Sequence, residues 1–487
     1  MLIIIIELLV VLLALYLGSK YGSLALGAIA GLGLAILVFD HGLKPGTPPT
    51  DVIYIIVAAV TCAGVLQASG GMDWMIQIVE RILRKHPQHI TFLAPLSTFF
   101  LTVVCGTGHV MYTLMPIVTD VAIKKGIRPE RPLAVASVAS MLAIVCSPIS
   151  AAVVAFSTIS GLNGFSISIP QIVAVTIPAC LCGIIAAASW SYNRGLDLEK
   201  DPEFLEKIKA PVQYAFVYGN TATTLDKQID KKSKWAVYIF LAAIVLIVIL
   251  AFAQNILPAF DTVKAIEGAS AVALPTGKTV SPSDLASAGI VMAGVTEKVP
   301  ATIHMYLVIQ IILISAAALM IIICGAKPKA AVAGNVWQSG MVAVVAIYGI
   351  AWLANTFFGA HMAEVEELLD EMVDNYPWAI ALVFFIFSVL INSQAAVVVA
   401  LLPVAYKLGI PGWILLGALP CVYGYFFIPN YPSDIATVNF DRTGTTVIGK
   451  YLLNHSFMMP GLISVIVSTI VGYLMTMVIF PGYFAGL

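Results

Sequence analysis

Two short polar motifs interrupt long apolar stretches of the chain: Gly106-Thr107-Gly108 and Asn392-Ser393-Gln394. The apolar runs beside the second motif, 377–391 and 395–402, are each too short for a membrane-spanning helix of about 20 residues. Hydroxyl, amide and backbone N–H groups at such a break can bind an anion, because the next helix points the positive end of its dipole at them. The alternative is close helix packing through small polar residues. Two breaks at matching places favour a substrate-binding site.

Two further breaks add polar candidates. Ser147-Pro148 interrupts the apolar run 133–157, and the stretch from Pro429 to Asp434 interrupts the run 411–441, because proline removes a helix hydrogen bond. An ionisable residue near the membrane midplane is functional by default, so Asp434 has three open roles: it couples a cation or proton, contacts a substrate ammonium group, or caps a helix N-terminus. The candidate substrate-binding residues are therefore Gly106, Thr107, Gly108, Ser147, Ser150, Asn392, Ser393, Gln394, Ser433, Asp434 and Thr437.

A second group of charged residues is predicted at the cytoplasmic edge. Bidentate arginines suit carboxylates, so these residues are candidates for gating, although anchoring by positive charge explains most of them. They are Glu80, Arg84, Arg128 and Arg131. All seven cysteines lie in apolar segments without a CxxC pair, which argues against disulfides and zinc. We find no catalytic triad or phosphate loop, and we predict no enzyme activity, metal or cofactor.

The composition predicts an all-α polytopic membrane protein. Apolar residues make up 60% of the chain and charged residues 10%, against about 25% charged in soluble domains. A net charge of −1 gives no general attraction to nucleic acid. The run 1–17 has no preceding Lys or Arg and no A-x-A site, so we expect a retained first helix. Spanning runs are expected at 1–17, 22–38, 52–69, 133–157, 171–191, 234–253, 304–324, 341–358, 411–441 and 455–480.

Charge asymmetry orients these runs. The Lys- and Arg-rich loop 192–234 should be cytoplasmic, whereas the acidic segment 359–376 and the insert 254–303 should be external, with both termini periplasmic. These assignments agree only if 90–123 and 377–409 each return to the side from which they enter. Both are therefore predicted to be re-entrant hairpins, the first entering from the cytoplasm and the second from outside.

The two hairpins divide the chain into two inverted repeats of about five transmembrane helices each. Residues 1–191 form the first repeat with hairpin 90–123 and broken helix 133–157. Residues 192–233 form a cytoplasmic linker. Residues 234–487 form the second repeat with the periplasmic loop 254–303, hairpin 377–409 and broken helix 411–441. Opposed repeats with discontinuous helices are typical of secondary transporters.

Local spacing supports the repeat. Thr107 precedes Pro116 by nine residues, as Gln394 precedes Pro403, and the return arms end at Gly126-Ile127 and Gly409-Ile410. An amphipathic helix is also predicted before each hairpin, either lying on the membrane face or packed as an ordinary connector. Its apolar stripe is Met75, Ile78, Val79, Ile82 and Leu83 in one repeat, and Val365, Leu368, Leu369, Met372 and Val373 in the other.

Several of these motifs, in this order, resemble the anaerobic C4-dicarboxylate transporter (Dcu) family of the ion-transporter superfamily, nearly end to end. They are Leu66-Gln67-Ala68-Ser69-Gly70-Gly71, Cys105-Gly106-Thr107-Gly108-His109, Ile127-Arg128-Pro129-Glu130-Arg131-Pro132, Asn392-Ser393-Gln394-Ala395-Ala396, Tyr431-Pro432-Ser433-Asp434 and Phe440-Asp441-Arg442-Thr443-Gly444-Thr445-Thr446.

The resemblance implies a multi-pass carrier of the bacterial inner membrane that exchanges fumarate, malate or aspartate for succinate in anaerobic respiration. It also implies an elevator-type movement, a homodimer in membrane lipid and, as a further partner, a sensor kinase. Sodium-coupled members of the superfamily carry Ser-Asn-Thr at both tips, so the different tips here weigh against sodium coupling. The insert 254–303 is longer than the family leads us to expect. A cation- or proton-coupled symporter and a membrane-embedded enzyme are the alternatives.

Overall fold

The computed structural model describes residues 2–21, 24–163, 165, 167–219, 222–253, 256–266, 272–273, 279–287, 290–292, 294–361, 363–364, 376–429, 431–449 and 454–480. Within these ranges seven helices are long and apolar enough to cross a membrane, and the bent pair 53–68 and 71–85 would make an eighth. The protein is an all-α multi-pass membrane protein, as predicted.

The first half of the chain is a continuous series of helices, most of them apolar. These are α1 (Leu2–Tyr21), α2 (Ala25–Ala35), α3 (Thr50–Ala68), α4 (Gly71–Lys85), α5 (Ile90–Cys105), α6 (Met111–Lys124), α7 (Glu130–Leu142), α8 (Ala151–Leu162), α9 (Ile169–Ser191), α10 (Pro202–Lys207) and α11 (Pro211–Tyr218).

The second half of the chain is also mainly helical, with the strands in an insert between α12 and α14. It comprises α12 (Lys231–Phe252), β1 (Ala259–Ala265), β2 (Val272–Ala273), β3 (Thr279–Val280), α13 (Pro282–Ser287), β4 (Thr296–Thr302), α14 (Met305–Cys324), α15 (Pro328–Ala333), α16 (Asn335–Ala360), α18 (Ile380–Ile391), α19 (Gln394–Lys407), α20 (Gly412–Ala418), α21 (Pro432–Phe440) and α22 (Met458–Ile479).

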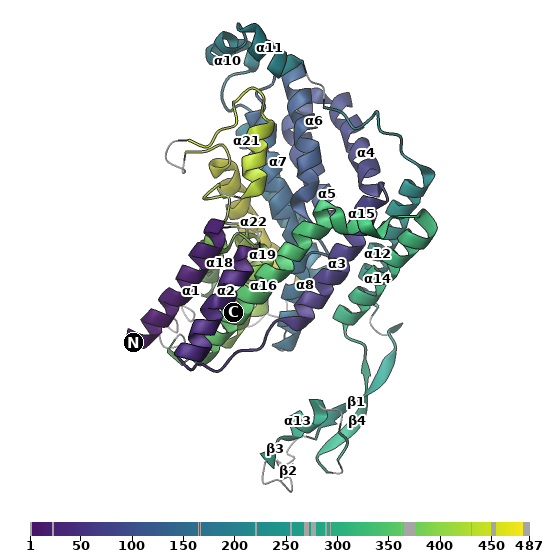
Figure 1. The fold of residues 1–487 in the computed structure, drawn as a ribbon, viewed down its shortest axis with the longest axis vertical. Coiled ribbons are helices and arrows are strands. Elements are labelled where there is room, and N and C mark those ends of the chain that lie inside the picture. The colour runs from purple at the N-terminus through teal and green to yellow at the C-terminus, as the bar shows by residue number, and fades with distance from the viewer. Residues whose placement is uncertain are drawn as a thin grey trace.

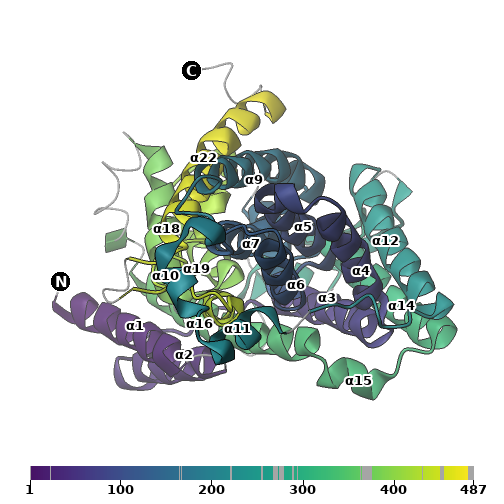
Figure 2. The ribbon, with the colours of Figure 1, turned by 90° about the horizontal axis from the view of Figure 1, so that it is seen from above.

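The helices form two groups. The frame consists of α1, α2, α3, α12, α14, α15 and α16, which pack mainly on one another. The hairpin unit consists of α5–α9 and α18–α22. Seen from above, α5, α6 and α7 are central, with α12, α14 and α15 to one side and α1 and α2 to the other (Figure 2). Helices α3 and α16 of the frame pack against α8 and α19 of the hairpin unit, so the two groups share a long interface.

The two hairpins, α5–α6 and α18–α19, open toward opposite ends of the molecule (Figure 1). Beside the open end of the first, Arg84 Nη1 donates to Asp120 Oδ2 at 3.0 Å and Arg84 Nη2 to the Ala222 carbonyl in the linker. Beside the open end of the second, the Tyr406 hydroxyl donates to Ser160 Oγ near the loop between α8 and α9. Each hairpin therefore returns to the end from which it enters.

Each half of the chain contains a broken helix, but the second break begins earlier than the predicted Pro429–Asp434, whose last three residues start α21. Between α7 and α8 the backbone makes a 3₁₀ turn over Ala143–Cys146 and is extended at Ser147. Between α20 and α21 a 3₁₀ turn over Leu419–Val422 leads into a non-helical segment. The α7–α8 stretch is almost completely surrounded by protein. Irregular backbone at membrane depth needs this protection, because lipid cannot satisfy its hydrogen bonds.

Helix α4 exposes only part of its predicted apolar stripe. Ile78 and Ile82 are 40% and 44% exposed, but Met75 and Leu83 of the same stripe are buried. Gln77 and Glu80 are also buried, against the linker. The exposed part fits a helix on the membrane face and the buried part fits an ordinary connector, so both interpretations stay predictions. The second predicted amphipathic stripe, within 365–373, lies outside the described residues.

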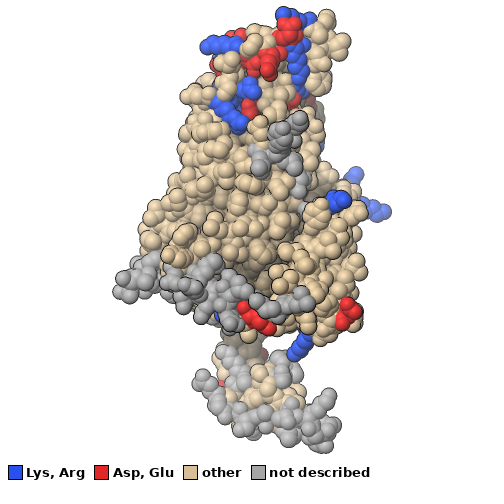
Figure 3. All heavy atoms as spheres, turned by 90° about the vertical axis from the view of Figure 1, so that its left-hand side faces the viewer, with Lys and Arg blue, Asp and Glu red and all other residues tan. Residues whose placement is uncertain are grey.

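The insert 254–303 is a local departure from the helical plan. Strands β1 and β4 pair antiparallel from Ala259↔Thr302 to Ala265↔Thr296 and project from the body (Figure 1). On the face shown in Figure 3, charged side chains gather at the opposite end, around α10 and α11, and the body below them carries few.

Candidate substrate site

The two hairpin tips have the same backbone shape. Helix α5 ends at Gly106 with φ 73°, and α18 ends at Asn392 with φ 54°, the one non-glycine with positive φ in the described part of the chain. The next residues, Thr107 and Ser393, are extended, with φ −147° and −152°. Glycine and asparagine are the residues that tolerate the left-handed conformation, which explains their place at the turns.

Thr107 and Ser393 then cap the returning helices. The His109 N–H donates to Thr107 Oγ1 and the Ala396 N–H donates to Ser393 Oγ, both at 3.4 Å. Short hydroxyl side chains make such caps. Thr107 and Ser393 therefore occupy equivalent positions in the two tips. The spacing to the prolines instead indicates Gln394, the next residue, as the equivalent of Thr107. Each hydroxyl accepts in its cap, and no described residue accepts its proton, which remains available for a ligand.

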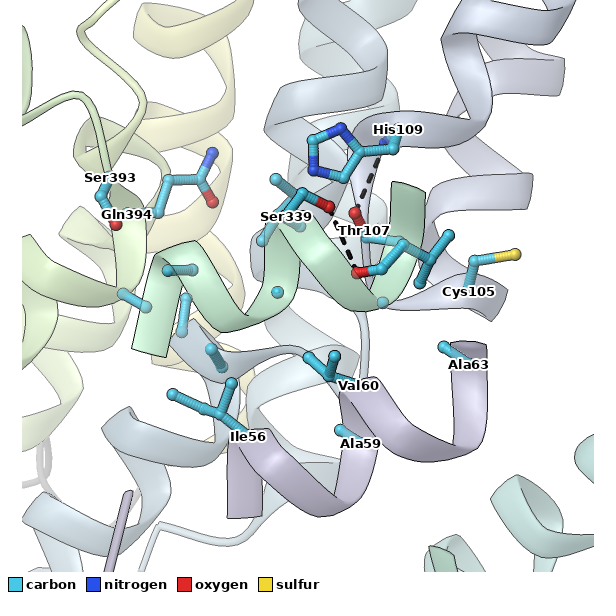
Figure 4. A pocket seen from close by; sticks show the side chains of 18 of the residues that line it. Ile56, Ala59, Val60, Ala63, Cys105, Thr107, His109, Ser339, Ser393 and Gln394 are labelled. Carbon is cyan, nitrogen blue, oxygen red and sulfur yellow. Dashed lines mark hydrogen bonds between the residues drawn. The ribbon is translucent and has the colours of Figure 1, made fainter. Parts of the chain in front are cut away.

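A cavity of about 150 Å³ lies between the tips and the frame (Figure 4). Thr107 and His109 reach it from one side and Ser393 and Gln394 from the other, with Ser339 of α16 between them. Tyr425 and Tyr431 of the second broken helix and small or apolar residues of α3, α8 and α16 complete its wall. These include Ile56, Ala59, Val60, Ala63, Ala151, Ala152, Gly340 and Ala343.

Five helices begin within two residues of a wall residue of this cavity: α6, α8, α16, α19 and α21. Each helix start carries roughly half a positive charge, and the described wall contains no Lys, Arg, Asp or Glu. The cavity is therefore suited to a small anion held by partial charges rather than by a full ion pair.

Helix α7 holds both tips in place. Ser140 Oγ donates to the Gly108 carbonyl at 2.8 Å, and Gln394 Nε2 donates to the Met141 carbonyl at 2.7 Å. A Cβ atom at Gly108 would lie 2.3 Å from Met141 Cε, so a larger residue there would displace the end of that side chain. Two hairpins from opposite halves of the chain are thereby fixed on one helix.

Gly106 also belongs to the described wall, and Asn392 lines a neighbouring cavity, whereas the remaining predicted site residues line neither. Ser150 caps α8 by accepting from the Val153 N–H. The Thr437 hydroxyl donates to the Ser433 carbonyl at 2.7 Å, and Asp434 Oδ1 accepts from the Ser137 hydroxyl at 2.8 Å. Among the described residues Ser137 is the hydrogen-bond donor to Asp434, so the helix-cap alternative finds no support.

Several buried polar atoms near the tips and breaks have no hydrogen-bond partner among the described residues. They are Gln394 Oε1, Ser147 Oγ, Ser433 Oγ and Asp434 Oδ2. A buried polar group without a partner costs about 1–3 kcal/mol. Their concentration at the tips and the helix breaks marks places where a ligand, an ion or water would be stabilised.

The predicted cytoplasmic-edge residues instead hold the linker against the helix ends. Glu80 accepts from Arg84 Nε at 2.8 Å and from Thr224 of the linker. Arg128 pairs with Asp201 at 2.7 Å, and Arg131 pairs with Asp197 at 2.8 Å. Neither Glu80 nor the three arginines belong to the described wall of the cavity.

Sequence reasoning missed four polar residues of the wall: His109, Ser339, Tyr425 and Tyr431. His109 follows the first tip, and its position two residues after Thr107 is a usable signal. Tyr425 precedes the predicted break from Pro429 to Asp434, and Tyr431 lies within it. No local pattern pointed to Ser339, which lies near the start of a different helix.

Comparison with known proteins identifies the family. The model of the anaerobic C4-dicarboxylate membrane transporters matches residues 3–480. The chain is 42% identical over 472 residues to the anaerobic C4-dicarboxylate transporter DcuB of Escherichia coli O6:H1, covering 96% of this chain and 97% of that protein. It is 33% identical over 476 residues to the C4-dicarboxylate transporter DcuA of Escherichia coli K12 (97% and 98%) and 32% identical over 475 residues to DcuA of Wolinella succinogenes (96% and 98%). This chain therefore belongs to the anaerobic C4-dicarboxylate membrane transporter family.

Proposed function

We propose that this protein carries C4-dicarboxylates across the bacterial inner membrane and exchanges fumarate, malate or aspartate for succinate. The observation that carries the proposal is the cavity at which five helices begin without a lysine or arginine in its described wall. The hydroxyls of Thr107 and Ser393 would donate to the two carboxylates. The relatives named above, whose names specify C4-dicarboxylate transport, support this class of substrate.

Exchange is favoured by the same electrostatics. A dianion held by dipoles and hydroxyls is released more easily than one paired with buried arginines. Without a bound dianion, the hydroxyl protons of Thr107 and Ser393 have no acceptor among the described residues. Moving these unsatisfied atoms through the membrane is unfavourable, so the empty carrier should reorient slowly. A counter-substrate would then be needed for each turnover.

The proposed movement is a displacement of the hairpin unit along the frame. Where α3 and α16 face the cavity they present small side chains, among them Ala59, Ala63, Gly340 and Ala343. A smooth surface of this kind lets a neighbouring unit slide with little steric resistance. We further propose periplasmic termini and assembly as a homodimer through the frame.

The test of exchange uses purified protein in proteoliposomes. Vesicles loaded with succinate should take up labelled fumarate rapidly, and empty vesicles should take up little because the unloaded carrier reorients slowly. Equal uptake into loaded and empty vesicles without an ion gradient would exclude obligatory exchange. Vesicles without protein and labelled glutamate, a dicarboxylate one carbon longer, serve as controls.

A second candidate is proton- or cation-coupled uptake. The observation that favours it is Asp434, a carboxylate that is 1% exposed and has one oxygen without a hydrogen-bond partner in the described structure. Uptake into empty vesicles that requires an inward proton or sodium gradient, and that Asp434→Asn abolishes, would establish this alternative. Uptake that depends on internal succinate and persists in Asp434→Asn would instead support exchange.

A further inference from the structure

A larger cavity adjoins the proposed substrate site. We call it the vestibule; its volume is about 820 Å³, and it shares His109, Ser339, Ala343, Ser393 and Tyr431 with the wall of the site cavity. Five shared residues mean that the two spaces are neighbours separated by side chains rather than by a helix. A ligand leaving the tips on this side would enter the vestibule.

One basic side chain belongs to the vestibule wall. Lys20, in the last turn of α1, is the one Lys, Arg, Asp or Glu among its described residues. Lys20 is exposed, and no ion pair or hydrogen bond joins its side chain to another described residue. Its charge is therefore not neutralised by a protein carboxylate in that part of the chain. Tyr16, one turn earlier, lines the same wall.

The vestibule lies at one end of the frame. Its frame residues come from the last turn of α1, the start of α2 and the first turns of α16, with Lys20, Leu26 and Ser339 as examples. These ends face the end of the molecule that carries α10 and α11 (Figure 1). With the sidedness predicted from Lys and Arg, this end is cytoplasmic.

We propose that Lys20 attracts dicarboxylates into a cytoplasmic vestibule, from which they reach the hairpin tips. The inference rests on the proposed transport function and deepens it by assigning a residue to one side of the cycle. A full positive charge at a mouth in contact with water raises the local concentration of a dianion. Placed outside the site cavity, it does so without holding the bound substrate.

The experiment compares the two faces of the membrane. Inside-out and right-side-out vesicles from cells that express the full chain are loaded with saturating succinate, and the initial uptake of labelled succinate is measured against its concentration. Lys20→Gln should raise KM in inside-out vesicles about three- to tenfold, the range for one unit charge acting on a dianion through several ångströms of water. In right-side-out vesicles KM should change less than about twofold, because screening limits the reach of the charge to about 10 Å.

Two variants serve as controls. Lys20→Arg keeps the charge and should keep the wild-type KM. Lys329→Gln, in α15, removes a charge from the same end of the frame at a residue outside the described walls of both cavities, and should leave KM unchanged. Salt gives a measurement without any substitution: it should raise the wild-type KM in inside-out vesicles, and raise it less in Lys20→Gln.

The outcomes separate the inference from the function on which it rests. Three outcomes would overturn the role of Lys20 while leaving exchange intact. They are an equal change in KM on both faces for Lys20→Gln, an unchanged KM for Lys20→Gln in inside-out vesicles, or an effect of Lys329→Gln on KM equal to that of Lys20→Gln. Wild-type vesicles that exchange no dicarboxylate in either orientation would refute the proposed function, and the role of Lys20 with it.

Discussion

Removing the tip hydroxyls should weaken substrate binding without altering the fold. Ser393 and Thr107 each accept a backbone N–H in the cap and keep the hydroxyl proton for a ligand. Ser393→Ala and Thr107→Ala remove that donor. A hydrogen bond to a charged group is worth roughly 1.5–3 kcal/mol. The cap hydrogen bond is present with and without substrate, so its loss cancels from the affinity.

The expected loss of affinity is therefore about 10- to 150-fold for each variant, since 1.4 kcal/mol corresponds to a factor of ten. Thr107→Ser should restore most of it because the hydroxyl returns. Ser339 provides a matched control in the same wall. Its hydroxyl already donates to the Asn335 carbonyl at 2.6 Å, so no proton is available for substrate, and Ser339→Ala should change the affinity less than about threefold.

The assay measures the dissociation constant of succinate by calorimetry on purified protein, with exchange in proteoliposomes as the functional readout. Melting temperatures of the variants in detergent check that they remain folded. Wild-type affinity in both tip variants would contradict the assignment of the tips. A loss in Ser339→Ala as large as that in Ser393→Ala would show that the cavity responds to any change of its wall rather than to the donors.

Two further substitutions test the architecture around the site. Gly106→Ala should destabilise the first tip by about 1–2 kcal/mol, because Gly106 has φ 73° and a Cβ atom there would lie 2.9 Å from Ile149 Cγ1. Asn392→Gly is the control and should be tolerated. Equal melting temperatures for Gly106→Ala and the wild type would count against the left-handed turn. Glu130→Ala should cost about 3 kcal/mol, because the buried carboxylate accepts from Arg128 at 2.8 Å and from Ser456 at 2.7 Å; Glu206→Ala, which breaks an exposed pair with Lys209, is the control and should melt like the wild type.

The membrane fold and the positions of the hairpin tips follow from local sequence. Apolar run length decides whether a segment can cross a bilayer, and Gly106 and Asn392 stand where the chain must turn left-handed. The ends of the return arms also follow from local sequence. The Gly126 N–H donates to the Ile123 carbonyl and the Gly409 N–H to the Tyr406 carbonyl, which forms matching turns at the two Gly-Ile pairs.

Which polar residues face the cavity was decided by packing between distant segments. Ser339 reaches the cavity because α16 crosses beside both tips, and Gln394 is turned toward the Met141 carbonyl of α7. Asp434, the most prominent candidate in the sequence, accepts instead from Ser137 behind the wall. The type of a residue and the place where the chain turns are local properties that the sequence specifies. The direction of a side chain depends on which other helix fills the space beside it, and only the tertiary structure specifies that.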